Sequence, residues 1–300
     1  MLTEPPLMSL TRLHRRTAVT TALKCLAILL GGIATAADET DLRTLNLGLL
    51  DAAKKGDTAL VESRLHDGAA TGTRDRFGNS ALIYAARGAH VETARVLIGA
   101  GADANQANVN GNTPLFEAAG SGSIELVRLL LGHGADPNLV SLKQVSPLAN
   151  AVYQKHSAIA EFLLQHGARA DFIDNTGKNS AVYAAANGDT EILGLILDSD
   201  NETSVPIDAQ YGHELTLLMW AAGYGNADSV RLLVSRGASV DLTDDRGKTA
   251  LMMAAENGHE DVVSFLVDSG ADTANRDKDG RTARELSEMA GESEIAATLN

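Results

Sequence analysis

Short apolar stretches recur along this chain at a constant spacing, and each follows a small polar residue. From residue 47 to 179, and again from 216 to 282, the polar residue, called here the marker position, returns every 33 residues. The markers are Leu47, which is the apolar exception, and the polar residues Ser80, Thr113, Ser146, Asn179, Thr216, Thr249 and Thr282. Only the step from 179 to 216 is longer, at 37 residues. A fixed period of this length indicates stacked copies of one small helical unit.

The pattern inside each period predicts two helices. Paired alanines five and six residues after the marker, such as Ala85 and Ala86, indicate a thin first helix that a neighbouring unit can approach closely. Apolar residues 14, 17 and 18 after the marker, such as Val127, Leu130 and Leu131, lie on one face of a second helix. A glycine then favours helix termination. The sequence therefore predicts an all-α solenoid of about eight helix–turn–helix units.

Local motifs resemble those of the ankyrin repeat family. TPLF from Thr113 and GADPN from Gly134 are similar to two signatures of that repeat, and the pattern recurs in register from about residue 42 to 300. The resemblance implies L-shaped units, each with a projecting β-turn finger, and a surface that binds other proteins. The expected units lie near residues 42–74, 75–107, 108–140, 141–173, 174–207, 208–243, 244–276 and 277–300.

The first 36 residues differ from the repeats. Four basic residues precede an apolar run from Cys25 to Ile33, and Ala34-Thr35-Ala36 follows as a small-residue cleavage site. This arrangement is typical of a secretory signal peptide. We expect residues 1–36 to be removed and residues 37–300 to form an exported repeat domain, periplasmic or secreted, without membrane insertion after cleavage. The alternative is an uncleaved N-terminal anchor.

The charge of the chain limits the class of partner, and its cysteine content bears on the compartment. The chain has a formal net charge of −14, and residues 1–36 contain four of its basic side chains. An acidic body repels nucleic acid, so we expect no nucleic-acid binding. The only cysteine, Cys25, lies in the predicted signal, which leaves the exported domain indifferent to an oxidising compartment. We expect a monomer that binds a protein partner.

Candidate catalytic and metal-binding groups have simpler explanations. The histidines ten residues after the marker, His90, His156 and His259, recur one per unit and so do not converge as metal ligands must. The aspartates five residues before the marker, such as Asp75 and Asp174, suit capping of the finger turn. We expect no catalytic, cofactor or metal site. A hydrolase or metal-dependent enzyme that uses groove carboxylates is the alternative from another class.

The ankyrin resemblance also implies where a partner would bind, because finger tips and the exposed ends of the first helices make most contacts in that family. The predicted partner-binding residues are Phe77, Val109, Asn110, Leu142, Lys143, Val145, Tyr153, Tyr211, Tyr224 and Arg246. Aromatic anchors in a polar rim are typical of binding hot spots. The alternative is that some tip side chains fold back onto neighbouring fingers. The aromatic residues four after the marker, Tyr84, Tyr183 and Trp220, are interpreted as core.

The expected function is therefore that of a non-enzymatic, exported protein-interaction module. Two other settings stay open: a secreted effector that acts on a host protein, and an auxiliary factor in periplasmic peroxide defence, as in some bacterial exported ankyrin proteins that this chain resembles.

Overall fold

The computed structural model describes residues 36–198 and 205–299. Within these ranges all 16 regular elements are α-helices, and backbone bridging is limited to two isolated pairs. Residues 46–300 form one compact unit, separate from residues 1–45. The predicted all-α solenoid is confirmed. The predicted signal segment lies outside the described residues except for Ala36, and its role stays a prediction.

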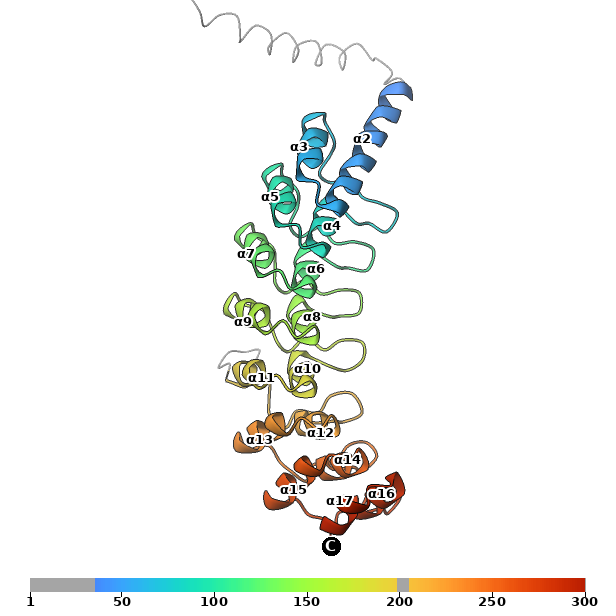
Figure 1. Ribbon diagram of the computed structural model, residues 1–300, viewed down its shortest axis with the longest axis vertical. Coiled ribbons are helices and arrows are strands. Elements are labelled where there is room, and N and C mark those ends of the chain that lie inside the picture. The colour runs from blue at the N-terminus through green and yellow to red at the C-terminus, as the bar shows by residue number, and fades with distance from the viewer. Residues whose placement is uncertain (1–35, 199–204, 300) are drawn as a thin grey trace, which may run out of the picture. The chain divides into compact units, whose positions relative to one another are not determined.

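First helices and second helices alternate along the chain (Figure 1), and in most units the second helix is slightly longer than the first. The first helices are α4 (Ala81–Arg87), α6 (Pro114–Ser121), α8 (Pro147–Tyr153), α10 (Ser180–Asn187), α12 (Leu217–Gly223), α14 (Ala250–Glu256) and α16 (Ala283–Ala290). The second helices are α3 (Thr58–His66), α5 (Val91–Gly99), α7 (Ile124–Gly132), α9 (Ser157–Gln165), α11 (Thr190–Leu197), α13 (Ala227–Ser235), α15 (Glu260–Asp268) and α17 (Ser293–Thr298).

Helix α2 (Ala36–Lys55) begins before the expected first unit and has 20 residues, whereas the other first helices have seven or eight. No glycine or proline occurs between Ala36 and Leu47 that would interrupt the helix before the first unit begins. Its last part belongs to the core, since Leu49 and Ala52 are fully buried.

The marker residues begin the first helices. The side chains of Ser80, Thr113 and Thr249 each accept a hydrogen bond from the backbone N–H three residues later, which satisfies a donor that the helix leaves unpaired. Pro114 and Pro147 occupy the first helical turn, where a missing N–H has no cost. These local signals explain why every unit starts its helix at the same place in the repeat.

Stacking buries what no unit could bury alone. Each first helix from α4 to α14 contacts the next first helix, and each second helix from α3 to α15 contacts the next second helix. The alanine pairs between first helices are fully buried: Ala85 and Ala86, Ala118 and Ala119, Ala221 and Ala222, Ala254 and Ala255. The core is thus a continuous layer between helices of successive units.

Histidines join successive units at the turn between the two helices. The Nε2 atoms of His156 and His259 lie 3.3 and 3.1 Å from the carbonyl oxygens of Gly120 and Gly223 in the unit before. Both histidines therefore have a structural hydrogen bond, which agrees with the reading of these rings as parts of the repeat.

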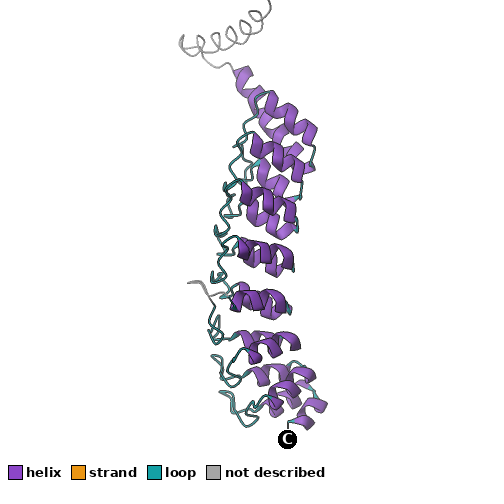
Figure 2. Ribbon diagram, turned by 90° about the vertical axis from the view of Figure 1, so that its left-hand side faces the viewer, coloured by secondary structure: helices purple, strands orange, loops and turns teal. Residues whose placement is uncertain are grey.

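The segments that lead from each second helix to the following first helix form the fingers. They gather along one side of the helices within residues 46–300 (Figure 2). The name finger face is used below for the surface made by the finger tips and by the sides of the first helices that turn toward them.

Candidate functional site

Backbone hydrogen bonds hold neighbouring fingers in a row. In each case the N–H four residues before a marker donates to the carbonyl three residues before the previous marker. The pairs are Val109 to Phe77 at 3.0 Å, Leu142 to Asn110 at 2.8 Å, Asn175 to Lys143 at 3.0 Å, Asp245 to His213 at 3.1 Å and Lys278 to Arg246 at 2.9 Å. The row presents its tips in fixed order, because each finger is tied to the one before it.

The row has one break among the described fingers. The expected bond from Gly212 to Thr176 is absent, and the two fingers instead meet at glycines, since a Cβ on Gly177 would lie 2.7 Å from the Cα of Gly212. This is where the repeat spacing lengthens. The second finger also has an unusual turn, with His213 and Glu214 both at φ 62°.

Aspartates close the finger turns, as the sequence predicted. The Oδ1 atom of Asp174 accepts hydrogen bonds from the N–H groups of Thr176 and Lys178, at 2.7 and 3.1 Å. Burial raises the pKa of Asp174, but hydrogen bonds from Tyr183, Thr176 and backbone amides outweigh it and lower the pKa below its usual value. The carboxylate is engaged in the turn, which leaves it unsuited to a catalytic role.

In five successive units, from the one that begins its first helix at Ser80 to the one that begins it at Thr216, the side chain four residues after the marker is half-buried and lies on the finger face. The interpretation of Tyr84, Tyr183 and Trp220 as core is wrong, because all three are only half-buried. The hydroxyls of Tyr84 and Tyr183 donate to the turn aspartates Asp75 and Asp174, at 2.6 and 2.5 Å. These rings link the first helix to the finger of the same unit.

Polar residues at the same position have a similar task. Glu117 accepts hydrogen bonds from Arg87 at 2.8 Å and from Asn112 at 3.0 Å. Asn150 donates to the carbonyl oxygen of Phe116 in the unit before, at 3.0 Å. The polar character of this position in two units, which is odd for a core site, follows from its place on the finger face.

Most of the predicted partner-binding residues are exposed. Among the apolar ones Phe77, Val109, Leu142, Tyr153 and Tyr224 have exposed fractions of 51, 56, 68, 59 and 58%. Asn110, Lys143 and Arg246 are also exposed, and Val145 is half-buried. Their accessibility is confirmed, and their role in binding stays a prediction.

Tyr211 corrects one of these expectations. It is only 8% exposed, so it is not a tip residue. It stands five residues before the marker, where other units have Asp174 or Asp244, and both of those are buried. Tyr211 instead pairs with Leu215 through two backbone hydrogen bonds of 2.8 Å that close the finger. Burial raises the pKa of its hydroxyl.

Four of the predicted residues come together around one hollow. Asn110, Leu142, Lys143 and Val145 line a cavity of about 480 Å³ between two fingers, and Phe116 of α6 is also part of its lining. The hollow combines apolar and amide groups with a lysine ammonium, a mixture typical of interaction surfaces.

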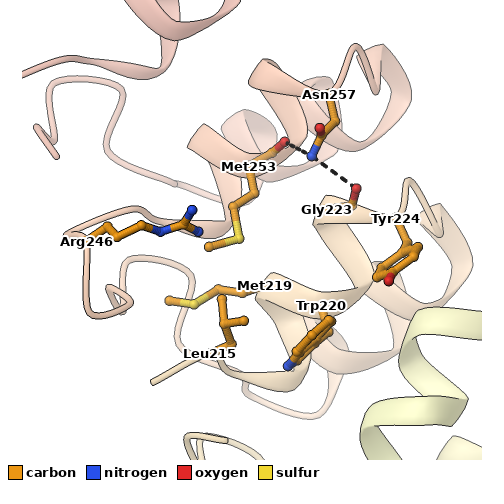
Figure 3. A pocket seen from close by; sticks show the side chains of 8 residues that line it. All are labelled: Leu215, Met219, Trp220, Gly223, Tyr224, Arg246, Met253 and Asn257. Atoms are coloured by element: carbon orange, nitrogen blue, oxygen red, sulfur yellow. Dashed lines mark hydrogen bonds between the residues drawn. The ribbon is translucent and has the colours of Figure 1, made fainter. Parts of the chain in front are cut away.

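A second, more apolar pocket of about 270 Å³ lies between α12, α14 and the next finger (Figure 3). Its walls are Leu215, Met219, Trp220, Tyr224 and Met253. Arg246 extends from its finger toward the sulfur of Met253, and Asn257 lies on the opposite side (Figure 3). The sequence predicted Tyr224 and Arg246 here but missed Trp220 and Met253, which share the position four residues after their markers.

Aromatic contacts extend this pocket toward the preceding units. The rings of Trp220 and Tyr224 stack with centroids 6.1 Å apart, and those of Tyr153 and Tyr183 meet edge to face at 5.5 Å. The ammonium of Lys178 lies between the two pairs, 5.9 Å from the Tyr183 centroid and 5.0 Å from that of Trp220. Three successive units thus share one aromatic strip.

Residues 36–198 and 205–299 hold no group of three His, Cys, Asp or Glu side chains arranged to bind a metal ion. In the same ranges, no helix has the length and apolar character needed to cross a membrane.

Paired helices stacked through buried alanines, with a row of hydrogen-bonded fingers, define a helical-repeat protein built to present a surface. A family model described as ankyrin repeats (3 copies) matches residues 49–141, 182–277 and 218–299, more than half of the chain. The chain belongs to the ankyrin repeat family. The unmatched stretch inside the repeats, residues 142–181, contains Gln144 and Lys155 at positions where most other units have glycine.

Two curated proteins are similar over short stretches. An E3 ubiquitin-protein ligase of Caenorhabditis elegans, hecd-1, is 36% identical over 78 residues, which are 26% of this chain and 3% of that protein. The human ankyrin repeat domain-containing protein 29 is 42% identical over 64 residues, 21% of this chain and 20% of that protein. The aligned part of this chain therefore spans a fifth or less of either relative.

Proposed function

We propose that this chain is an exported binding protein that captures a protein partner on its finger face. Membership of the ankyrin family supports protein binding in general. The observation that carries the specific proposal is the alignment of exposed apolar side chains along a row of fingers whose backbones are hydrogen-bonded together. The backbone that carries these side chains is already fixed before binding, so little backbone conformational entropy is lost when a partner covers them.

The binding surface is centred on the hollow at Leu142 and on the neighbouring exposed ring of Tyr153. Leu142 is the most exposed of the predicted apolar residues, at 68%. Exposed apolar side chains beside a lysine and two asparagines form an apolar centre with a polar rim, the arrangement in which a few anchors supply most of the binding free energy.

The test compares partner capture by the full chain and by a double variant, Leu142→Asp with Tyr153→Ala, from a cell-envelope extract. We expect the double variant to lose the captured protein and to keep its thermal unfolding midpoint. Leu195→Asp is the matched control, because it places the same charge on the second helix α11 at a residue that is 39% exposed. Equal capture by the wild type and the double variant would contradict the assignment of this surface.

Export is the second part of the proposal and rests on the layout of residues 1–36. When the chain is expressed with its own N-terminus in a bacterium, we expect the mature protein to begin at residue 37 and to leave the cytoplasm. Intact-mass measurement on cell fractions tests this. Recovery in the periplasm or in the medium separates a periplasmic role from that of a secreted effector, and an uncleaved cytoplasmic protein contradicts export. Sedimentation tests the expected monomer.

A further inference from the structure

The strongest unassigned feature is the pocket at Trp220 together with the lysine beside it. Its lining contains one cation, Arg246, and no carboxylate. The guanidinium of Arg246 is held by Asp244, whose side chain is fully buried, at 2.8 Å. The pocket is therefore an apolar hollow with a fixed positive group at the finger side.

Lys178 adds a second positive group. Unlike Arg246, it has no carboxylate partner within the described residues. Its side chain is half-buried against the rings of Tyr183 and Trp220. The neighbouring Asp174 is engaged by Tyr183 and by its own turn. Cation–π contact stabilises the ammonium only in part, so its donors remain available to an anionic ligand.

Two further polar groups point to a peptide as the ligand. Asn257 uses its Nδ2 atom to bind the carbonyl oxygens of Gly223 and Met253, which orients the side chain and leaves its amide oxygen to accept a backbone N–H. The indole Nε1 of Trp220 is buried and makes no hydrogen bond in this structure, so it can donate to a ligand oxygen once the side chains that cover it shift.

The size of the pocket indicates which apolar group of the ligand would accompany the anionic group at Lys178. At about 270 Å³ it lies just below the range of pockets for complete small molecules, about 300–1,000 Å³, and suits a single large side chain. Its methionine and aromatic walls favour Phe, Leu or Met. Since the Trp220 ring borders both Lys178 and the pocket, the anion and the apolar side chain belong within one or two residues of each other in an extended segment, which rises about 3.3 Å per residue.

We propose that this site binds an extended protein segment in which Asp or Glu lies within two residues of Phe, Leu or Met. The carboxylate binds Lys178, and the apolar side chain enters the pocket between Met219, Trp220 and Met253. The inference rests on the proposed function and names the chemistry of its partner. The net charge of −14 does not oppose it at short range, because charges beyond about 10 Å are screened at 0.1 M salt.

The chain provides its own probe, since Trp220 is its only tryptophan. The full chain is titrated with the capped hexapeptide Ser-Gly-Asp-Phe-Gly-Ser while the emission of Trp220 is followed. We expect saturable binding, about fivefold to tenfold tighter than for the analogue with Asn in place of Asp, and loss of binding when Ala replaces Phe. An analogue with Lys in place of Asp binds weakest.

Two variants locate the effect. Lys178→Gln is expected to remove the preference for Asp over Asn, whereas Lys55→Gln, which changes an exposed lysine of α2 outside the finger face, leaves it unchanged. The proposal is overturned if Trp220 emission does not respond to the acidic peptide, if the Lys analogue binds as tightly, or if Lys178→Gln keeps the preference. If Lys178→Gln also captures the natural partner normally while the Leu142 and Tyr153 variant does not, the proposed function stands and this inference fails.

Discussion

The hydroxyl of Tyr183 donates a hydrogen bond of 2.5 Å to the Oδ2 atom of Asp174, which joins the first helix of a unit to its own finger. The same link connects Tyr84 to Asp75, at 2.6 Å. In both units the other carboxylate oxygen accepts backbone N–H groups of the turn. The position of the finger relative to the helix therefore depends on one shared carboxylate.

Removal of this hydroxyl is expected to destabilise the array. Tyr183→Phe leaves an aspartate oxygen without its donor, and hydrogen bonds to charged groups contribute about 1.5–3 kcal/mol when buried. Because Tyr183 is only half-buried, we expect about 1 kcal/mol in the free energy of urea unfolding. Tyr84→Phe should give a loss of similar size, since its geometry matches. A Phe variant as stable as the wild type at both sites would show that the link is incidental.

The turn aspartates make stability fall in acid. Burial raises the pKa of Asp75, Asp174 and Asp277, but their hydrogen bonds prevail and lower it below the usual value. Folding thus favours their ionised form. Their contribution is complete above the pKa of an unfolded aspartate, about 3.9, and is lost as the pH falls through the lower folded values.

We expect the free energy of unfolding to decrease between about pH 5 and pH 2. Asp174→Asn should be less stable than the wild type at neutral pH and should lose less stability over this interval, because one of the titrating groups is gone. Urea unfolding at several pH values measures both curves. Parallel curves for the wild type and Asp174→Asn would contradict the role given to this carboxylate.

Lys155 offers a gain in stability at a turn. It ends the first helix of its unit with φ 62°, a left-handed conformation that costs a residue with a Cβ about 1 kcal/mol. Gly122, Gly188 and Gly258 adopt the same conformation at this position in other units. Lys155→Gly should raise the free energy of unfolding by about 0.5–1 kcal/mol.

The neighbouring residue is the matched control. Gln154 has φ −83°, where glycine has no conformational advantage, so Gln154→Gly should destabilise by about 0.5–1 kcal/mol. Opposite signs for the two glycine substitutions in thermal unfolding support the backbone argument. Two stability changes of the same sign would contradict the backbone argument and indicate that side-chain contacts determine the stability of this turn.

The repeat register predicted the fold well because its signals are local. Thr113 caps the N-terminus of α6, and Gly134 adopts a positive φ just after α7. Both effects depend on neighbouring residues of the chain and not on distant contacts. The same register indicates burial of Tyr211, since the residues five before the marker in the neighbouring units are buried. The aromatic character of Tyr211 suggested a tip, whereas its place in the repeat determined its burial.

The composition of the finger face could be predicted only in part. Exposure of Leu142 and Tyr153 followed from the repeat, because one unit resembles the next. The pocket at Trp220 did not, because it needs side chains from two successive first helices and a finger, with Lys178 from yet another unit. The pocket exists because the side chains four residues after the marker face the fingers. Apolar periodicity in the sequence does not distinguish such a side chain from one that faces the core.

Gly122 tests how closely the turns of successive units approach. It has φ 82°, and a Cβ there would lie 2.8 Å from the ring of His156, which itself lies within hydrogen-bond distance of the Gly120 carbonyl. Gly122→Ala therefore combines backbone strain with a clash that displaces this histidine. We expect a loss of about 2–3 kcal/mol, the sum of a strained conformation and a broken contact between units.

Gly132, the last residue of α7, provides the control for that substitution. A Cβ at Gly132 meets no atom within 4 Å, and its backbone lies outside the left-handed region. Gly132→Ala should therefore be neutral or stabilise by up to about 1 kcal/mol, through the higher helix propensity of alanine. Urea unfolding of both variants, with His156→Ala alongside, separates the strain at Gly122 from the lost histidine contact. Equal stabilities for Gly122→Ala and Gly132→Ala would mean that the turns have room to move apart and that the His156 contact does not fix the spacing of the units.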